Sequence, residues 1–240
     1  MATHSGDRAD RRADRVRDIP QASAARLPGY LRVLDEFPFG RTVCSKDLAI
    51  AAGVDAAKLR RDLSFLGSYG VRGVGYDTAT LKAEISRVLG AHVDHRVALV
   101  GVGNLGHALA GYSGFAGHGF RLVALFDIDP QVIGTMATAA GTGQTGLLVH
   151  HIADAGAVLA TERVTIGIVT TPANAAQQSA DVLVGAGVRS ILNFAPCPLD
   201  VPVDVHVRQV DLGLELQMLA FHEACRPDEL AAALSRAVAL

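Results

Sequence analysis

The chain has 240 residues, half of them hydrophobic, and a net charge of −2. This length and composition suit one large domain or two small ones, and the near-neutral charge excludes a protein that coats nucleic acid non-specifically. No apolar run is long enough for a membrane span, and the charged N-terminus lacks the apolar region of a signal peptide. The three cysteines are odd in number and far apart, which favours packed thiols in a reducing cytoplasm over a disulfide framework or a metal cluster.

Charge is distributed unevenly along the chain. Residues 1–90 hold 15 Lys and Arg against 11 Asp and Glu, whereas residues 91–240 hold 7 against 13. The basic bias of the first part leaves a local nucleic-acid surface open. Within it, residues 1–18 are polar and mixed in charge, which predicts a disordered leader.

Three helices are predicted next. The first ends near Phe37, and Ser45 caps a second that runs through Ala52. After a turn at Gly53, Asp55 caps a third helix that reaches about residue 67. This spacing is typical of a helix-turn-helix unit.

The third helix has two distinct faces. Leu59, Leu63 and Leu66 share one face, while short polar residues and Arg61 lie on the other. Such an outward face suits a major groove, with Arg61 at a base edge and flanking cations on phosphates. A basic solvated helix on a three-helix core explains the same pattern equally well.

A hairpin is predicted over residues 69–76, where glycines alternate with apolar residues like the wing of a winged helix, and this shifts the balance toward DNA binding. A linking helix follows from Asp77 to Leu89. The predicted DNA-contacting residues are Lys58, Arg60, Arg61, Ser64 and, at the wing tip, Arg72.

From residue 96 the pattern is that of alternating strands and helices. Near-continuous apolar strands between helices predict a Rossmann-like, doubly wound parallel sheet covered on both faces, so that the fold class is α/β. The predicted strands are 96–100, 121–126, 147–150, 164–170, 188–193 and 205–210.

The first of these strands runs into a G-x-G-x-x-G turn at Gly101–Gly106, which is typical of a dinucleotide site. Asp127 follows the second strand, where a carboxylate binds the adenosine ribose and favours NAD over NADP. The loops Thr170–Pro172 and Asn193–Pro196 follow two later strands and so lie at the same edge of the sheet, where they could line a nicotinamide pocket. Taken alone, each loop is more simply interpreted as an ordinary turn between a strand and a helix. The predicted cofactor residues are Gly101, Val102, Gly103, Asn104, Leu105, Gly106, Asp127, Ile128, Thr170, Thr171, Pro172, Asn193, Phe194 and Ala195.

Catalytic chemistry is not visible in the sequence. No histidine, lysine or tyrosine stands in a recognisable proton-donor setting, and the adjacent His150 and His151 would face opposite ways on a strand, which disfavours a metal site. The dinucleotide then acts as a signal, and the protein is not an enzyme. The alternatives are an NAD-dependent dehydrogenase with an N-terminal assembly domain and a structural CoA- or nucleotide-binding module.

Five segments together resemble the Rex family of bacterial redox-sensing repressors. They are Lys58–Gly67, Tyr69–Tyr76, Gly101–Gly106, Phe126–Pro130 and Ile191–Pro196. The resemblance implies a cytoplasmic homodimer with exchanged C-terminal helices, which reads an inverted-repeat operator of respiratory or fermentative genes and leaves this double-stranded DNA when NADH replaces NAD+.

The resemblance also implies an ion-pair switch in which Arg32 exchanges between Asp211 and Tyr112. At Leu212, where family members often carry an aromatic residue, the sequence departs from the pattern. The expected organisation is a leader at 1–18, a winged-helix domain at 19–90, a Rossmann domain at 91–212 and a C-terminal helical dimerisation segment at 213–240.

Overall fold

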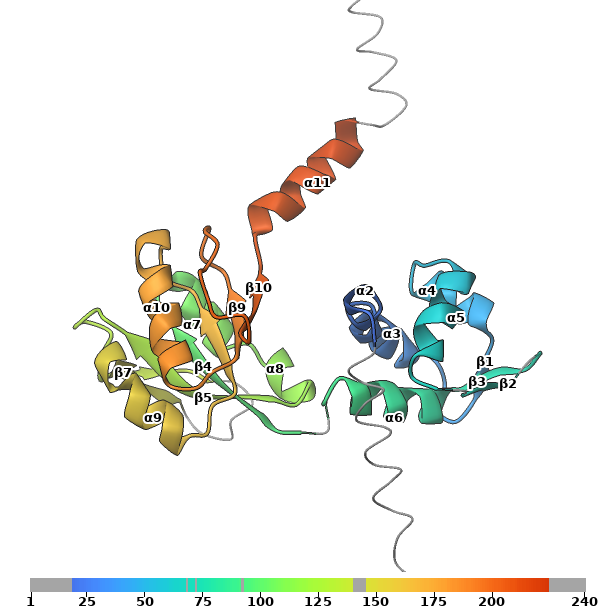
Figure 1. Ribbon diagram of the computed structural model, residues 1–240, viewed down its shortest axis with the longest axis horizontal. Coiled ribbons are helices and arrows are strands. Elements are labelled where there is room, and N and C mark those ends of the chain that lie inside the picture. Colours follow the sequence, from blue (N-terminus) through green and yellow to red (C-terminus); the bar gives the residue numbers. More distant parts are fainter. Residues whose placement is uncertain (1–18, 68, 72, 92, 140–145, 225–240) are drawn as a thin grey trace, which may run out of the picture. The chain divides into compact units, whose positions relative to one another are not determined.

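The computed structural model describes residues 19–67, 69–71, 73–91, 93–139 and 146–224. The chain divides into two compact units, Met1–Val93 and Asp94–Leu240, and each is described by itself (Figure 1). The leader at 1–18 and the end of the C-terminal segment at 225–240 lie outside the described residues, as does Arg72.

The first unit is a winged helix. Its elements are α2 (Gln21–Ala24), α3 (Leu27–Leu34), β1 (Thr42–Val43), α4 (Ser45–Ala51), α5 (Ala56–Ser64), β2 (Gly70–Val71), β3 (Gly75–Asp77) and α6 (Thr78–Val88). The strands form a small antiparallel sheet in the order β1-β3-β2. The core gathers Leu27, Leu48, Leu59, Leu81 and Ile85, all fully buried, so apolar side chains from four helices, two of them from α6, hold the unit together.

Three sequence expectations for this unit need correction. Ser45 does not cap α4, because the helix begins at Ser45 itself and the Cys44 Sγ accepts the hydrogen bond from Asp47 N at 3.4 Å. Helix α3 ends at Leu34 rather than near Phe37, and α5 ends at Ser64 rather than near residue 67. Asp55 does cap α5, accepting hydrogen bonds from Ala57 N and Lys58 N.

The second unit is an α/β fold. Its elements are β4 (His95–Val100), α7 (Asn104–Ala110), α8 (Gly114–Gly117), β5 (Phe120–Asp127), β6 (Met136–Ala137), β7 (Leu147–His151), a 3₁₀ turn (Ile152–Asp154), α9 (Ala155–Thr161), β8 (Ile166–Val169), α10 (Ala173–Gly185), β9 (Ser190–Asn193), β10 (His206–Gln209) and α11 (Leu212–Ala224). The six predicted strands are confirmed, and they pair in parallel. The short β6 was not predicted, and it adds to β7 in the antiparallel sense.

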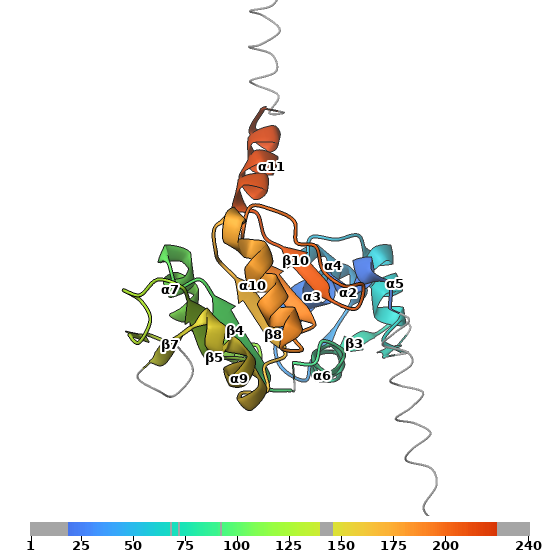
Figure 2. The ribbon, with the colours of Figure 1, turned by 60° about the vertical axis from the view of Figure 1, so that its left-hand side comes forward.

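The strand order β10-β9-β8-β4-β5-β7-β6 places the central strand β4 between β5 and β8. From β4 the chain builds one side of the sheet and then crosses over to build the other, so the order reverses between β4 and β8. One apolar cluster packs α9 and α10 on one face, and a second packs α7 and Phe115 of α8 on the other (Figure 2). The doubly wound architecture is therefore confirmed, and ligands of such sheets bind where the order reverses.

Helix α11 has no buried residue in this chain. Its six large apolar side chains are all more than half exposed: Leu212, Leu214, Leu216, Met218, Leu219 and Phe221. A helix that is this apolar on all sides is not stable in water alone.

Candidate functional site

The glycine turn after β4 shows a separate need for each glycine. Gly101 has a φ of +98°, and a Cβ there would lie 2.9 Å from the carbonyl carbon of Thr170. A Cβ on Gly106 would overlap the carbonyl oxygen of Gly101, so only glycine lets α7 begin this close to the strand. Gly103 is different, because a Cβ there would meet nothing within 4 Å. Its open side leaves room for a ligand to approach the backbone.

A pocket of about 500 Å³ lies at this turn, at the carboxyl ends of β4, β5 and β8. Its lining is mostly apolar and backbone, with a few polar groups, as in cofactor sites. The lining residues are Val100, Gly101, Val102, Gly103, Asp127, Ile128, Asp129, Val132, Ile152, Thr170, Thr171, Pro172, Ala175, Gln178 and Ser179. The structure thus brings together the glycine turn, Asp127 and the Thr-Thr-Pro loop, which sequence reasoning had assigned to one ligand.

Asp127 is held in place by backbone groups. Its Oδ2 accepts a hydrogen bond from Val102 N at 2.5 Å, and its Oδ1 accepts from Ile128 N at 2.7 Å and Asp129 N at 2.9 Å. A carboxylate has about four acceptor positions, so this one can still accept a hydroxyl from a ligand. The carboxylate is thereby fixed beside the glycine turn before any ligand arrives.

The Thr170–Pro172 loop, which follows β8, also lines the pocket that the glycine turn and Asp127 line. Thr170 Oγ1 donates to the Gly101 carbonyl at 2.6 Å, which ties the end of β8 to the glycine turn across the point where the strand order reverses. Thr171 Oγ1 lies 3.4 Å from Ser179 Oγ on α10.

Not every predicted cofactor residue lines this pocket. Asn104 and Leu105 are exposed at the start of α7 and Gly106 is buried against the turn, but none of the three is among the lining residues. Asn193 is fully buried, and its amide serves the protein: Nδ2 donates to Cys197 O and Gln209 Oε1, and Oδ1 accepts from Ala195 N. It shapes the loop after β9.

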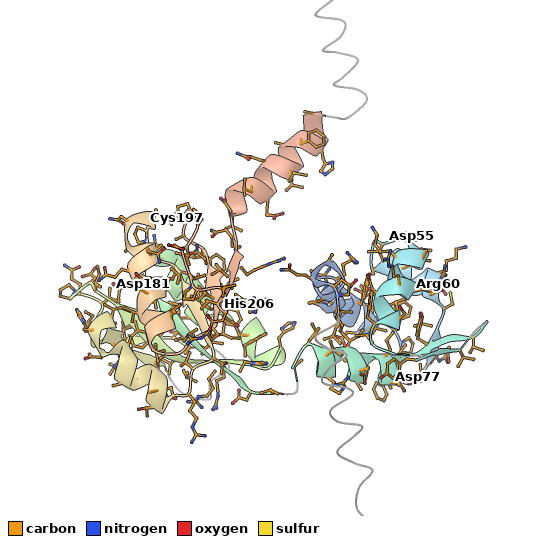
Figure 3. The ribbon with its side chains drawn as sticks, in the orientation of Figure 1. Asp55, Arg60, Asp77, Asp181, Cys197 and His206 are labelled. Atoms are coloured by element: carbon orange, nitrogen blue, oxygen red, sulfur yellow. The ribbon has the colours of Figure 1, made fainter. Side chains whose placement is uncertain are left out.

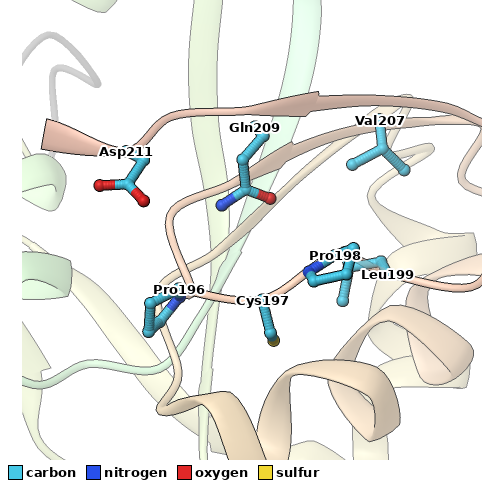
Figure 4. A pocket seen from close by; sticks show the side chains of 7 residues that line it. All are labelled: Pro196, Cys197, Pro198, Leu199, Val207, Gln209 and Asp211. Carbon is cyan, nitrogen blue, oxygen red and sulfur yellow. The ribbon is translucent and has the colours of Figure 1, made fainter. Parts of the chain in front are cut away.

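That loop borders a second pocket, of about 390 Å³, at the same edge of the sheet (Figure 4). Figure 4 shows the loop on one side and the end of β10 on the other. The lining residues are Pro196, Cys197, Pro198, Leu199, Val207, Gln209 and Asp211. The two pockets lie at the carboxyl ends of different strands of the same sheet.

Sequence reasoning missed the helical and loop contributors to the first pocket. Ala175, Gln178 and Ser179 come from the first turns of α10, and Val132 and Ile152 from connections. The α10 residues could have been predicted from the sequence near the loop. Helix α10 starts directly after the Thr-Thr-Pro loop, so residues three and four apart in its first turns lie on the helix face that lines the pocket.

The DNA-reading prediction for α5 agrees with its exposure. Leu59 and Leu63 are buried, while Lys58, Arg60, Arg61 and Ser64 are exposed. Figure 3 marks Arg60 along α5 and Asp55 at its start. Arg60 Nη1 donates to Ser45 Oγ at 3.2 Å, beside a hollow of about 560 Å³ between α5 and the β2–β3 hairpin. The unit therefore presents cations next to a concave surface.

A buried carboxylate on the same helix was missed. Asp62 is 1% exposed, and it accepts hydrogen bonds from Ser23 Oγ at 2.8 Å, Tyr30 Oη at 2.7 Å, and Arg26 Nε and Nη2 at 2.6 and 2.7 Å. Burial alone would raise the pKa of Asp62, but the hydrogen bonds from Arg26, Tyr30 and Ser23 outweigh it and hold that pKa below its ordinary value. We call these four residues the Asp62 cluster.

The Asp62 cluster makes a prediction for alkaline pH. Burial, with the Asp62 carboxylate adding to it, raises the pKa of Tyr30 from 10.0 to about 12. A raised pKa means that the stability tied to the neutral phenol is complete below pH 10.0 and is lost as the pH rises toward 12. Between these values, the melting temperature of the parent should fall more steeply than that of Tyr30→Phe. Parallel curves would contradict this.

The three residues of the implied switch are divided between the units. Arg32 is exposed on α3 of the first unit. In the second unit, Tyr112 is 54% exposed with its ring edge-on to Phe115, and Asp211 Oδ1 accepts from Gly213 N at 2.8 Å at the start of α11. Each is placed at a surface or helix end, and the exchange itself stays a prediction.

Within the described part of the chain, no group of three or more His, Cys, Asp or Glu is placed to hold a metal ion. Over those same residues, no helix combines the length and the apolar character needed to cross a bilayer.

Comparisons with known proteins agree with this geometry. A family model described as a CoA binding domain matches residues 92–197, and one described as the N-terminus of a DNA-binding protein matches residues 18–64. The redox-sensing transcriptional repressor Rex of Streptomyces griseus is 54% identical over 94% of this chain and 87% of its own length. That of Thermus thermophilus is 40% identical over 85% of this chain and 93% of its own length.

Solved structures give the same result. The crystal structure of RSP in complex with β-NAD+ and operator DNA is 32% identical, with a TM-score of 0.80 over 90% of this chain and 97% of RSP. RSP in complex with β-NADH is 31% identical, with a TM-score of 0.77 over 90% of this chain and 98% of RSP. On the identity and coverage of these relatives, the chain belongs to the Rex family of redox-sensing transcriptional repressors.

Proposed function

We propose that this protein is a homodimeric repressor that binds an operator through α5 and the wing and leaves it when NADH occupies the glycine-turn pocket. The observation that carries the proposal is the pairing, in one chain, of a pocket at a G-x-G-x-x-G turn with an exposed cationic helix. RSP, its structural neighbour, has been crystallised with operator DNA and β-NAD+ together, and also with β-NADH. The relatives are named as repressors, which argues against the dehydrogenase alternative.

The pocket fits a dinucleotide at three points. The open side of Gly103 and the N-terminus of α7 suit a pyrophosphate, because the first backbone N–H groups of a helix point at the ligand. The fixed Asp127 carboxylate can still accept a hydrogen bond from a hydroxyl of an adenosine ribose. The Thr170–Pro172 loop and the second pocket lie at the ends of β8, β9 and β10. With the adenosine at Asp127 and the pyrophosphate at the glycine turn, the nicotinamide is expected at the ends of these strands. NADH and NAD+ differ only at that ring, so discrimination has to arise there.

The DNA side follows from α5. Arg61 is proposed to read a guanine edge, Lys58 and Arg60 to contact phosphates, and Ser64 to lie at the end of the reading face. The wing residue Arg72 is proposed for the minor groove. A repressor of this kind acts in the cytoplasm, where it meets both chromosomal DNA and the NADH pool.

The apolar surface of α11 supports the homodimer. Exchange of α11 between subunits would bury those side chains. It would also carry Asp211, which directly precedes α11, into the dimer interface, where an ion pair with Arg32 or its replacement by Tyr112 could shift the equilibrium between two conformations of the dimer.

Two binding measurements test this function. Calorimetry should detect NADH binding, and selection from a random duplex library should enrich an inverted repeat, because a two-fold dimer reads two half-sites. Substrate-dependent NADH turnover without DNA enrichment would instead favour a dehydrogenase.

Asp127→Ala is expected to weaken NADH binding by about 1–3 kcal/mol, because a charge-assisted hydrogen bond to the ribose is lost. The same change should improve NADPH binding relative to NADH, since the carboxylate no longer repels a 2′-phosphate. Asp204→Ala, which removes an exposed carboxylate paired with Arg189, is the matched control. An Asp127→Ala protein with parental NADH affinity would remove Asp127 from the site.

A further inference from the structure

One buried carboxylate joins the reading helix to the N-terminal helices of its unit. All donors to Asp62 come from Ser23, Arg26 and Tyr30, in the segment from α2 to α3 that lies 32 to 39 residues earlier in the chain. Both carboxylate oxygens are used twice: Oδ1 by Ser23 and Arg26 Nη2, Oδ2 by Arg26 Nε and Tyr30. No acceptor position is left for solvent.

The cluster adjoins the reading face directly. Asp62 follows Arg61 in α5, and successive residues of a helix point about 100° apart, so fixing one side chain inward fixes the direction of the next. Leu59 and Leu63 also pack inward, but the hydrophobic effect that buries them is non-directional. A bidentate arginine–carboxylate pair with two further hydroxyl donors adds directional hydrogen bonds, which specify one orientation of the helix.

The contribution of the Asp62 cluster to the free energy of unfolding is not enough to explain why it is there. Removing the Asp62 carboxylate from water costs free energy that offsets its attraction to the partly exposed Arg26, so the pair adds little net stability over well-packed apolar side chains. What such a pair does define is one relative placement of the elements that it joins. Here those elements are α5, which carries Arg61, and α3, which carries Arg32.

We propose that Asp62 is a positioning residue for DNA reading: the Asp62 cluster fixes α5 against α2 and α3, so that Arg61 is presented to the operator in one orientation. Because α3 also carries Arg32, the same cluster makes the switch-bearing helix and the reading helix a single rigid body. The inference rests on the proposed function, and Asp62 itself touches no DNA.

The test compares Asp62→Asn with the parent, at a temperature where both are fully folded by circular dichroism. Operator affinity should fall about tenfold or more, while affinity for a random duplex and for NADH stays within about twofold. The direction of the change in operator affinity is informative. Losing a negative charge should by itself strengthen binding to phosphates, so a fall in affinity cannot come from the charge change alone. Asp35→Asn makes the same charge change at an exposed carboxylate of the same unit, paired with Lys82, and should not lower operator affinity.

Tyr30→Phe provides a second, milder variant. It removes one donor to Asp62 and keeps the ring in the core, so it should lower the ratio of operator to random-duplex affinity by about threefold to tenfold. A merely structural role would lower the melting temperature and leave this ratio unchanged. Folded variants with the parental ratio would overturn the proposal. A parent that binds no DNA would overturn the proposed function instead.

Discussion

Replacing Gly103 by alanine is expected to weaken NADH binding at least 100-fold, about 2.7 kcal/mol, while leaving the folded protein nearly as stable as the parent. The backbone at Gly103 has a φ of −76°, which alanine adopts without strain, and a Cβ there meets no protein atom within 4 Å. The methyl group instead occupies the space through which the pyrophosphate reaches the helix N-terminus. Calorimetric NADH titration and thermal melting measure the two effects separately.

Two other glycines serve as references for this result. Gly156, in α9, also has nothing within 4 Å of an added Cβ but lies outside the pocket, so Gly156→Ala should bind NADH normally. Gly106→Ala should lose stability and binding together, because its Cβ overlaps the Gly101 carbonyl. If Gly103→Ala binds NADH as tightly as the parent, the dinucleotide does not approach the backbone at this turn.

Replacing Arg61 by alanine is expected to abolish selective operator binding. An arginine that donates two hydrogen bonds to a guanine edge contributes about 1–3 kcal/mol of discrimination, and a symmetric dimer loses it at both half-sites. NADH affinity should not change, because Arg61 belongs to the winged-helix unit. The measurement is the ratio of operator to random-duplex affinity at fixed salt.

Lys58→Ala distinguishes a base contact from a phosphate contact. Lys58 is exposed in the first turn of α5, where a cation suits a phosphate. Its loss should weaken operator and random duplex alike and reduce the slope of log affinity against log salt concentration by about two, one for each subunit of the dimer. If Arg61→Ala behaves in this way too, Arg61 contacts a phosphate and the base reader lies elsewhere.

The parts of the fold that were predictable depend on short-range patterns. Leu59 and Leu63 recur at helical spacing, and the glycine turn needs residues that are close in sequence, so α5 and the β4–α7 turn were both recognisable. Asp127 was also recognisable, since its distance from the glycines follows from the length of one helix and one strand.

The parts that were not predictable depend on distant partners. Asp62 looks like a surface acid on a polar helix, and nothing near it in sequence shows that Arg26 and Tyr30 meet it. Asn193 looks like a ligand residue at a strand end, yet Gln209 and the Cys197 carbonyl take its amide. Cys44 replaces Ser45 as a cap because strand β1 ends at Val43, and periodicity alone cannot fix that boundary.

The proposed function requires that occupancy of the pocket is linked to DNA binding. The most direct test follows the anisotropy of a fluorescent duplex, selected by the protein itself, while NADH or NAD+ is added at fixed salt. We expect NADH to release the DNA at far lower concentration than NAD+ does, even with Leu212 in place of the aromatic residue common in the family. DNA that stays bound at saturating NADH, confirmed by calorimetry on the same complex, would contradict it.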